Sequence, residues 1–526
     1  MNIVRDGRAW QRKLVPAITA TALFSGTARA GAQQTFPRAL DDYVSQSVSR
    51  LELPGAALAV VKDGRVVVTK GYGVRELGKP DLIDANTIFD IASLTKSFTA
   101  AAVGALVDDG TLVWDDPVRR HLPQLTFADP YLTANVTLRD LLSHRTGIAA
   151  ANQAAFSAVL PRAALIRAAA RMPVVAPFRE RYVYSNVGYT IAAEAAATAA
   201  GSSWRSLVTQ RLLVPLGMTR TTADFAAAPQ LGNLAVGHAL FGGVQRAVPR
   251  GGVSRITTEP AGAVQSSAAD LARWMNFHLS NGSRDGKRIL SADALNDMHS
   301  PHIVSRTTSA FRESRQVKYY AGYGMGWQVF DYRGHRILWH SGNGDGQVAY
   351  MAIFPDAGLG VAVLVNSWKA DGSLNRAIAS RIFDHYLNLP TRDYVAEWQE
   401  GRIADADRRA DEERAMATAR QAAVRPTLPL AGYAGRFRDE LALTWTVSLE
   451  NDTLRIRHAD GEQGTLTHWS ANTFRVRWTN PLRADDAELA VFVRFPISGE
   501  GVADLLLMEP GPFRERVTAR REANAT

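Results

Sequence analysis

The amino-acid sequence predicts an α+β fold, in which helices flank an antiparallel sheet and an all-helical subdomain is inserted, followed by a small C-terminal all-β barrel. Two observations favour the first part: strand-like apolar runs occur at both ends of residues 36–390, and helical patterns fill the middle. The third observation is the alternation of apolar and polar residues after residue 428, which is typical of short strands in a barrel or sandwich.

The first thirty residues are typical of a secretory signal peptide. Arg5, Arg8 and Lys13 belong to a basic start, an uncharged apolar stretch follows, and Ala28-Arg29-Ala30 is a small-x-small cleavage pattern. The apolar stretch is too short to cross a bilayer, and no later stretch is long and apolar enough. We therefore expect a periplasmic or secreted protein, cleaved near Ala30, without a stable membrane span.

Residues 36–390 read as one mixed unit. A polar helical segment at residues 40–51 precedes two apolar runs, residues 56–61 and 66–69, and the Asp-Gly between the runs predicts a hairpin. Strands near both ends of the unit are expected to share one sheet. The further expected elements are helices at residues 163–172, 190–200 and 268–279, strands at 337–339, 347–354 and 359–366, and a closing helix at 374–389.

Two segments follow this unit. Residues 391–427 are rich in alanine and charged residues, which predicts a solvated helical linker that the prolines near its end terminate. In residues 428–520, Trp445, Val447 and Leu449 alternate with polar residues, and Asn451-Asp452 forms a turn. This pattern predicts the strands of a separate barrel domain.

Composition excludes several functions. The chain has 526 residues, so two or three domains are expected, and it has no cysteine, which excludes disulfides, a thiol nucleophile and cysteine-ligated metals. The formal net charge is +9, but the basic residues are scattered and not clustered beside aromatic ones. We therefore expect no nucleic-acid partner.

Ser93 and Lys96 form the first candidate chemical pair. Leu94, Phe98 and Ala101 begin an apolar stripe with helical spacing, so Ser93 is expected in the first turn of a helix, with Lys96 one turn further on. Serine is a weak nucleophile and needs a base, and burial favours the neutral form of lysine. The alternative is a helix-capping serine beside an exposed lysine.

Tyr184 and Asn186 form the second candidate pair. A phenolate near a lysine ammonium could take the serine proton, and an asparagine two residues on could bind a substrate amide. The alternative for Tyr184 is a half-buried aromatic residue before a helix. Residues 386–388 match the same Y-x-N pattern but fall in the closing helix.

His340-Ser341-Gly342 ends an apolar strand and is the third candidate. Gly342 is expected to let substrate approach the strand edge, and the backbone N–H of Asn343 could form an oxyanion hole with that of Ser93. The alternative is a strand-end turn with a surface histidine. His144 is a rival histidine, but it precedes no strand.

The three candidates together resemble the serine β-lactamases, the DD-peptidases and related esterases, whose elements S-x-x-K, Y-x-N and K-T-G or a variant occur in that order. The resemblance covers residues 40–388 and includes further stretches: residues 53–56, 89–93, 138–147, 215–218 and 323–327.

The resemblance implies acyl transfer through a covalent intermediate, without a metal or an organic cofactor. Ser93 would be the nucleophile, Lys96 and Tyr184 its activating pair. His340 would belong to the catalytic set, and the groups that position substrate would be Asn186, Ser341, Gly342 and Asn343. The C-terminal domain resembles the lipocalin-like barrels appended to some of these hydrolases.

His340 departs from the pattern, because the β-lactamases and DD-peptidases usually have lysine there. A lysine is a fixed positive charge suited to a substrate carboxylate, whereas a histidine near its ordinary pKa of about 6.5 is only partly charged at neutral pH. We therefore expect hydrolysis of amide bonds in small or D-residue-containing peptides, ahead of carboxylesterase and β-lactamase activity.

A function of another class stays open, that of a non-catalytic protein that binds penicillins or peptidoglycan. The presence of Ser93, Lys96 and Tyr184 together counts against it, because a pure binder does not need all three. The expected partner is a small-molecule or peptide substrate. The acyl group, the stereochemical preference and the oligomeric state are left open by the sequence.

Overall fold

The computed structural model describes residues 35–149, 160–251, 257–305, 321–370, 372–419, 424–439, 442–479, 491–498, 501–502, 504–508 and 516–522. The predicted signal peptide, residues 1–30, lies outside the described residues. None of the helices that the structure describes combines the length and apolar character needed to cross a bilayer.

An antiparallel sheet organises the N-terminal unit, as predicted. Its strands are β1 (Gly55–Lys62), β2 (Arg65–Gly73), β9 (Ile303–Val304), β10 (Ala321–Tyr323), β11 (Gln328–Tyr332), β12 (His335–Gly344), β13 (Gln347–Phe354) and β14 (Leu359–Val365). They lie in the order β2-β1-β14-β13-β12-β11-β10-β9. β1 and β2 form the predicted hairpin, and Ala56 of β1 lies opposite Val365 of β14. Strands from the two ends of the unit are therefore neighbours.

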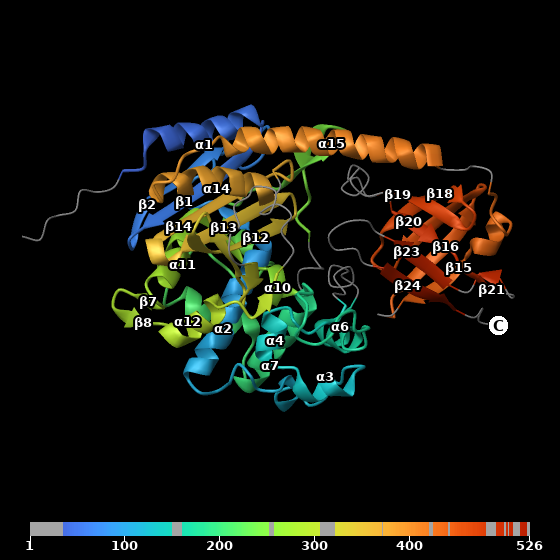
Figure 1. Ribbon diagram of the computed structural model, residues 1–526, viewed down its shortest axis with the longest axis horizontal. Helices are drawn as coiled ribbons and strands as arrows, with labels where there is room; N and C mark the ends of the chain where they lie inside the picture. The colour runs from blue at the N-terminus through green and yellow to red at the C-terminus, as the bar shows by residue number, and fades with distance from the viewer. Residues whose placement is uncertain are drawn as a thin grey trace, which may run out of the picture. The chain divides into compact units, whose positions relative to one another are not determined.

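Helices cover both faces of this sheet (Figure 1). The covering helices are α1 (Arg38–Arg50) and α14 (Gly372–Tyr386) on one face, and α2 (Thr95–Asp108) and α11 (Ala268–Leu279) on the other. Leu58 and Val60 of β1 pack into the core beneath α1 and α14, whereas Ala57 and Ala59 pack towards α2 and α11. Because both faces are covered, β1 is a continuous apolar run and not an alternating one.

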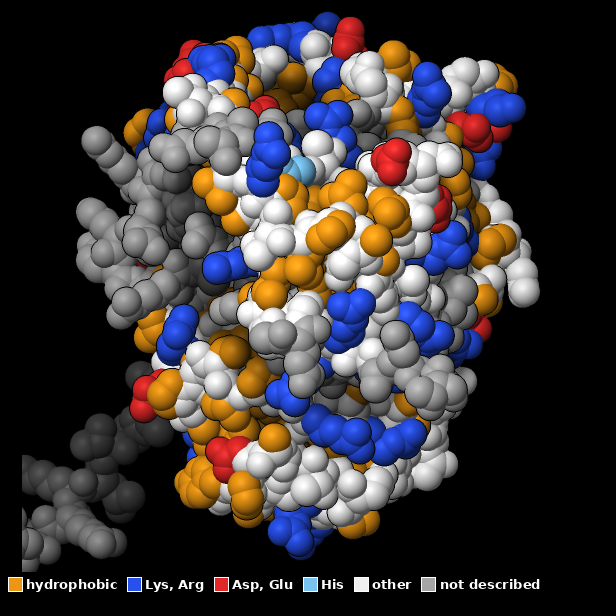
Figure 2. All heavy atoms as spheres, turned by 90° about the vertical axis from the view of Figure 1, so that its right-hand side faces the viewer, with side chains coloured by type: hydrophobic (Ala, Val, Ile, Leu, Met, Phe, Trp, Pro, Cys, Tyr) orange, Lys and Arg blue, Asp and Glu red, His pale blue; other side chains and the backbone are white. Residues whose placement is uncertain are grey.

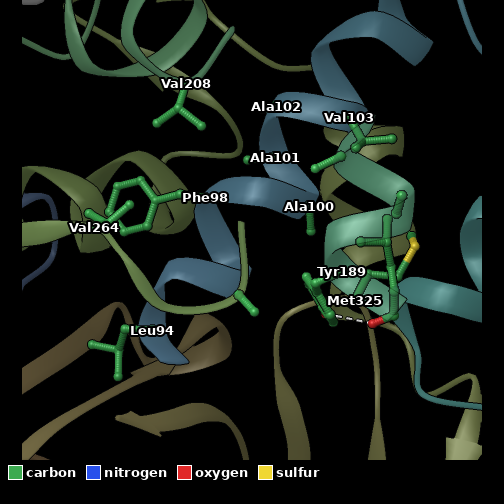
Figure 3. Close-up of a cluster of buried hydrophobic side chains, with 14 of the residues drawn as sticks. Leu94, Phe98, Ala100, Ala101, Ala102, Val103, Tyr189, Val208, Val264 and Met325 are labelled. Carbon is green, nitrogen blue, oxygen red and sulfur yellow. Dashed lines mark hydrogen bonds between the residues drawn. The ribbon is translucent and has the colours of Figure 1, made fainter. Parts of the chain in front are cut away.

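Helix α2 is buried on all sides, which differs from the predicted apolar stripe. Every residue from Thr95 to Leu106 is buried. Figure 3 shows Phe98 and Val264 on one side of the helix, and Val103 and Tyr189 on the other. A helix that is enclosed by other elements needs small or apolar side chains all round. The composition of such a helix therefore predicts its burial, whereas its periodicity does not.

The inserted segment is mainly helical. It lies between β3 (Ile88–Asp90) and β6 (Gln265–Ser267), which pair with each other. The predicted helices at residues 163–172, 190–200 and 268–279 correspond to α6, α7 and α11. The described α-helices and hairpin between α2 and β6 are α3 (Pro130–Asn135), α4 (Leu138–Leu142), α6 (Arg162–Ala169), α7 (Asn186–Ala199), α8 (Trp204–Val208), the hairpin β4–β5 (His238–Phe241 and Val244–Ala247) and α10 (Glu259–Gly262). After β6 come α11, the hairpin β7–β8 (Ser283–Arg284 and Lys287–Arg288) and α12 (Ala292–His299).

A long helix, α15 (Tyr394–Ala419), follows the N-terminal unit, and a closed barrel comes after it, as predicted. The strands of the barrel, in order, are β15 (Gly435–Asp439), β16 (Thr444–Glu450), β17 (Thr453–His458), β18 (Gln463–Ser470), β19 (Thr473–Trp478), β20 (Phe492–Arg494), β23 (Asp504–Met508) and β24 (Arg516–Arg521), with a small hairpin β21–β22 (Ile497–Ser498 and Gly501–Val502) beside them.

Side chains fill the described part of the barrel interior. Tyr433, Phe437 and Phe474 are buried there and pack against Phe495. The outward positions between them are mostly polar, and Figure 2 shows Lys and Arg side chains spread among apolar and other side chains over one face of the molecule. The closed barrel is confirmed, and its likeness to lipocalins stays a prediction.

Asp384 of α14 ties three elements together inside the N-terminal unit. Its carboxylate is fully buried and accepts hydrogen bonds from the Tyr332 hydroxyl at 2.9 Å, the Tyr394 hydroxyl at 2.8 Å and Arg333 Nη1 at 2.8 Å. Tyr332 ends β11 and Tyr394 begins α15, so one side chain holds both to α14.

We expect Asp384→Ala to lower the free energy of unfolding by about 3–5 kcal/mol, because it removes the buried carboxylate that accepts hydrogen bonds from the Arg333 cation and from two buried phenols. The matched control is Asp356→Ala, whose pair with Arg336 is exposed and contributes less than about 1 kcal/mol. Urea unfolding followed by tryptophan fluorescence measures both losses. Equal losses in the two variants would contradict the expectation.

Candidate active site

Ser93 lies in a short 3-10 turn, Ala92–Leu94, directly before α2. Sequence analysis predicted the first turn of the helix itself, so the nucleophile candidate precedes the helix by one turn. Ala92 has a φ of 44°, a left-handed conformation that is uncommon for a residue with a side chain. Asp90 Oδ1 accepts the Ala92 N–H at 3.0 Å and holds this bend. The strained turn therefore sits immediately beside Ser93, as strained backbone often does at functional sites.

The structure brings the first two motifs together at the Ser93 hydroxyl. Lys96 Nζ lies 3.1 Å from Ser93 Oγ, within hydrogen-bond distance, and the Tyr184 hydroxyl donates to the same oxygen at 2.9 Å. Lys96 Nζ also lies 4.8 Å from the centre of the Tyr184 ring. An alcohol, an amine and a phenol from segments about ninety positions apart thus share one hydrogen-bonded cluster.

The Lys96 amine is enclosed completely. Its side chain is 0% exposed, and burial lowers its pKa well below the ordinary 10.5. It donates to Asn186 Oδ1 at 2.8 Å and to the backbone carbonyl of Ala261 at 2.7 Å. Burial therefore favours the neutral amine, which can accept a proton.

Sequence analysis missed Ala261. Its helix, α10, is held against α2 because the Thr99 hydroxyl donates to the Pro260 carbonyl at 2.6 Å and the Val264 N–H donates to the Thr95 hydroxyl at 2.9 Å. Every residue has a backbone carbonyl, so no sequence motif could have identified the one of Ala261 as part of the site. The polar Thr95 and Thr99, one turn apart on a helix of apolar residues, are the only trace in the sequence.

A helix cap positions Tyr184 and Asn186. Ser185 caps α7, since its side chain accepts the Gly188 N–H at 3.1 Å. Asn186 is consequently the first residue of the helix and is buried, and Tyr184 ends the preceding loop. Burial raises the pKa of Tyr184, so the group is a protonated phenol at neutral pH and not the phenolate that was considered.

Gly342 brings β12 against the nucleophile turn. Pairing of β12 with β11 ends at Trp339, which leaves residues 340–344 beyond the neighbouring strand. A Cβ on Gly342 would lie 2.1 Å from the Ile91 carbonyl oxygen and 3.0 Å from Ser93 N. The glycine is thus required by the protein's own backbone, and its contact with substrate stays a prediction. Ser341 is half-buried and Asn343 exposed on either side of it.

His340 is buried and neutral. Its Nε2 lies 3.2 Å from the Tyr323 hydroxyl and its Nδ1 lies 2.6 Å from the Ser341 carbonyl oxygen. Burial lowers its pKa to about 3, so it carries no charge at neutral pH. Nor do the site's side chains build a metal centre: in the ranges that the structure covers, no three His, Asp or Glu side chains are grouped to hold an ion.

Two family models match parts of this chain. The family model described as Beta-lactamase matches residues 40–382, and a model described as a domain of unknown function (DUF3471) matches residues 419–520. The octameric penicillin-binding protein homologue from Pyrococcus abyssi shares the fold, with a TM-score of 0.59 and 22% identity over 92% of this chain and 99% of that one.

Curated relatives include hydrolases and a penicillin-binding protein. "Unguisins hydrolase ungD'" of Aspergillus campestris is 27% identical over 92% of this chain and 91% of its own length. "Unguisins hydrolase ungD" of Aspergillus violaceofuscus is 29% identical over 75% of this chain and 73% of its own. "Penicillin-binding protein 4" of Amycolatopsis lactamdurans is 30% identical over 60% of this chain and 82% of its own. Since the family model matches most of the chain, this protein belongs to the beta-lactamase family.

Proposed function

We propose that the chain is an exported serine hydrolase that forms a covalent acyl-enzyme on Ser93 and cleaves amide bonds in small or D-residue-containing peptides. One observation carries the proposal: the Ser93 hydroxyl is hydrogen-bonded to both the Lys96 amine and the Tyr184 phenol. This arrangement matches what an activated serine requires, a base within reach and a second proton donor beside it. Export is supported by the basic start, the apolar stretch and Ala28-Arg29-Ala30.

Lys96 is the proposed base. Asn186 Oδ1 and the Ala261 carbonyl can only accept hydrogen bonds, and they engage two N–H groups of the amine. A neutral amine has two N–H groups and one lone pair, so its lone pair is left for Ser93. The serine proton then moves to Nζ while Oγ attacks the substrate carbonyl.

Tyr184 is the proposed donor to the leaving group. Because its phenol is protonated and points its hydroxyl at Ser93 Oγ, it is ready to give a proton to the amide nitrogen as that nitrogen departs. Lys96 then returns a proton to the phenolate. In a second step water attacks the acyl-enzyme with Lys96 again as base, and Lys96 passes the proton it takes from the water to Ser93 Oγ as the acyl group leaves. The backbone N–H groups of Ser93 and Asn343 are the proposed oxyanion donors.

The neutral state of His340 supports a substrate without a carboxylate anchor at this place. A buried imidazole with a pKa of about 3 supplies a hydrogen-bonding surface but no fixed positive charge. This favours amides and peptides over β-lactams, whose carboxylate would need a cation. The two fungal relatives are hydrolases by name, which supports hydrolysis over binding alone.

A fluorophosphonate probe is expected to label the mature chain at Ser93, and Ser93→Ala should abolish labelling and lower hydrolysis by about 10⁴-fold or more. The substrate panel contains L- and D-amino-acid amides, short peptides, p-nitrophenyl esters and nitrocefin. Ser300→Ala, which removes an exposed hydroxyl outside the site, is the matched control. Folded wild type without any labelling would point to a binding protein, and dominant nitrocefin turnover would reverse the substrate ranking.

The rate of acylation is expected to fall as pH decreases through the lowered pKa of Lys96, because the protonated amine cannot act as base. The acid limb of kcat/KM should therefore lie well below the ordinary lysine pKa of 10.5, and no alkaline loss should occur up to pH 10.0, since burial raises the pKa of Tyr184 above that value.

Lys96→Arg supplies the matching test, because a guanidinium does not deprotonate. We expect it to lower kcat by about 10²–10⁴-fold at every pH, while Lys62→Arg, in β1 and away from the site, retains the wild-type profile. An acid limb near pH 10.5, or a fully active Lys96→Arg enzyme, would exclude Lys96 as the base.

A further inference from the structure

His144 lies beneath the active site and was only a rival candidate in the sequence. It follows α4 and has a φ of 59°, a left-handed conformation. Its side chain is 1% exposed. Its ring centre lies 4.5 Å from that of Tyr184, 5.1 Å from that of Tyr189 and 4.8 Å from that of Tyr323. The ring therefore occupies the centre of a buried aromatic cluster that includes the proposed proton donor.

Two hydrogen bonds connect His144 to the residues on either side of Tyr184. The His144 carbonyl accepts the Val183 N–H at 2.8 Å, and His144 Nδ1 accepts the Ser185 N–H at 3.1 Å. The backbone before and after Tyr184 is thus bonded to one residue. With the ring contact added, the position and the direction of the phenol are both constrained by His144.

The segment that carries His144 is itself anchored. Asp140, fully buried in α4, accepts Arg145 Nε at 2.6 Å and Arg179 Nε at 2.9 Å. The Arg179 N–H in turn donates to the Arg145 carbonyl at 2.8 Å. The loop that ends at Tyr184 is therefore joined to the α4 turn at Arg179 as well as through His144, so His144 is a fixed support.

The charge state of His144 suits a support and not a proton carrier. Because Nδ1 accepts the Ser185 N–H, the ring proton of the neutral form is on Nε2. Burial, with Lys96 and His340 nearby, lowers its pKa well below the ordinary 6.5. The Nε2 atom has no hydrogen-bond partner among the described residues, so no proton path leads from it to Ser93.

We propose that His144 is the positioning residue for Tyr184: its Nδ1 and its carbonyl hold the backbone on both sides of the tyrosine, and this sets the direction of the phenol. This rests on the proposed function, because it assumes that Tyr184 transfers a proton. A histidine fits the place since its acceptor lies two bonds beyond Cβ, its ring fills the aromatic cluster, and it tolerates a positive φ better than most residues.

His144→Phe and His144→Asn separate the two features. Phenylalanine keeps a ring but loses the acceptor; asparagine keeps an acceptor at the place of Nδ1 and also tolerates a positive φ. We expect His144→Phe to lower kcat by about 10–100-fold with little change in KM, because it displaces the phenol and touches no substrate. His144→Asn is expected to recover most of that loss.

A double-mutant cycle with Tyr184→Phe tests whether His144 acts through the tyrosine. Tyr184→Phe should lower kcat by about 10²–10⁴-fold, and adding His144→Phe to it should cause little further loss. Far-UV circular dichroism and labelling of Ser93 by the fluorophosphonate probe establish that each variant is folded. Thermal unfolding reports any stability loss separately from kcat.

The outcomes distinguish the two proposals. If Tyr184→Phe lowers kcat but the effects of the two substitutions multiply, His144 does not act through Tyr184, and its positioning role is wrong while the proposed mechanism stands. If His144→Asn is as slow as His144→Phe, the Nδ1 acceptor is not what matters, and the role is again wrong. If Tyr184→Phe retains wild-type kcat, the proposed role of Tyr184 fails and the inference fails with it.

Discussion

The burial of one amine is the constraint on which this active site depends. Lys96 has no access to water, and an ammonium in such a place would lose several kcal/mol of hydration, so the neutral form is favoured. The amine is nevertheless fully hydrogen-bonded, because Asn186 and Ala261 accept its protons. What is left is a lone pair beside the Ser93 hydroxyl. In the proposed mechanism this neutral lysine makes the serine reactive, and the surrounding fold keeps the lysine buried.

The fold keeps the amine dry by enclosing the start of α2 from several sides. On one side a Cβ at Gly326 would lie 2.7 Å from Ser97 Cα, and on another a Cβ at Gly342 would lie 2.1 Å from the Ile91 carbonyl oxygen. These two backbone contacts leave no space for a side chain at either glycine. Phe98 stacks on Trp274 with ring centres 3.9 Å apart and closes the region below. The glycines of two motifs therefore serve close packing around the nucleophile turn.

The same enclosure sets the charge of the neighbouring histidines. His340 and His144 are both buried, and burial lowers the pKa of each. Each imidazole accepts through one ring nitrogen: His340 is within reach of the Tyr323 hydroxyl, and His144 accepts the Ser185 N–H. The region beneath Ser93 thus contains neutral imidazole rings, which form hydrogen bonds with neighbouring groups and carry no charge to attract an ion. Its chemistry suits a neutral amide, which is why the proposed substrate carries no anchoring carboxylate.

The sequence by itself determined the fold class, the paired ends of the sheet, the barrel and the order of the three motifs, because strand alternation, turns and S-x-x-K spacing are local properties of the chain. Only the tertiary structure decided that α2 is enclosed on all sides, that the Ala261 carbonyl accepts a hydrogen bond from Lys96, and that Gly342 packs directly against the backbone at Ile91. Those features depend on contacts between segments that are far apart in the chain. A backbone carbonyl or a glycine contributes to them through its position in space, and residue type alone does not predict that position.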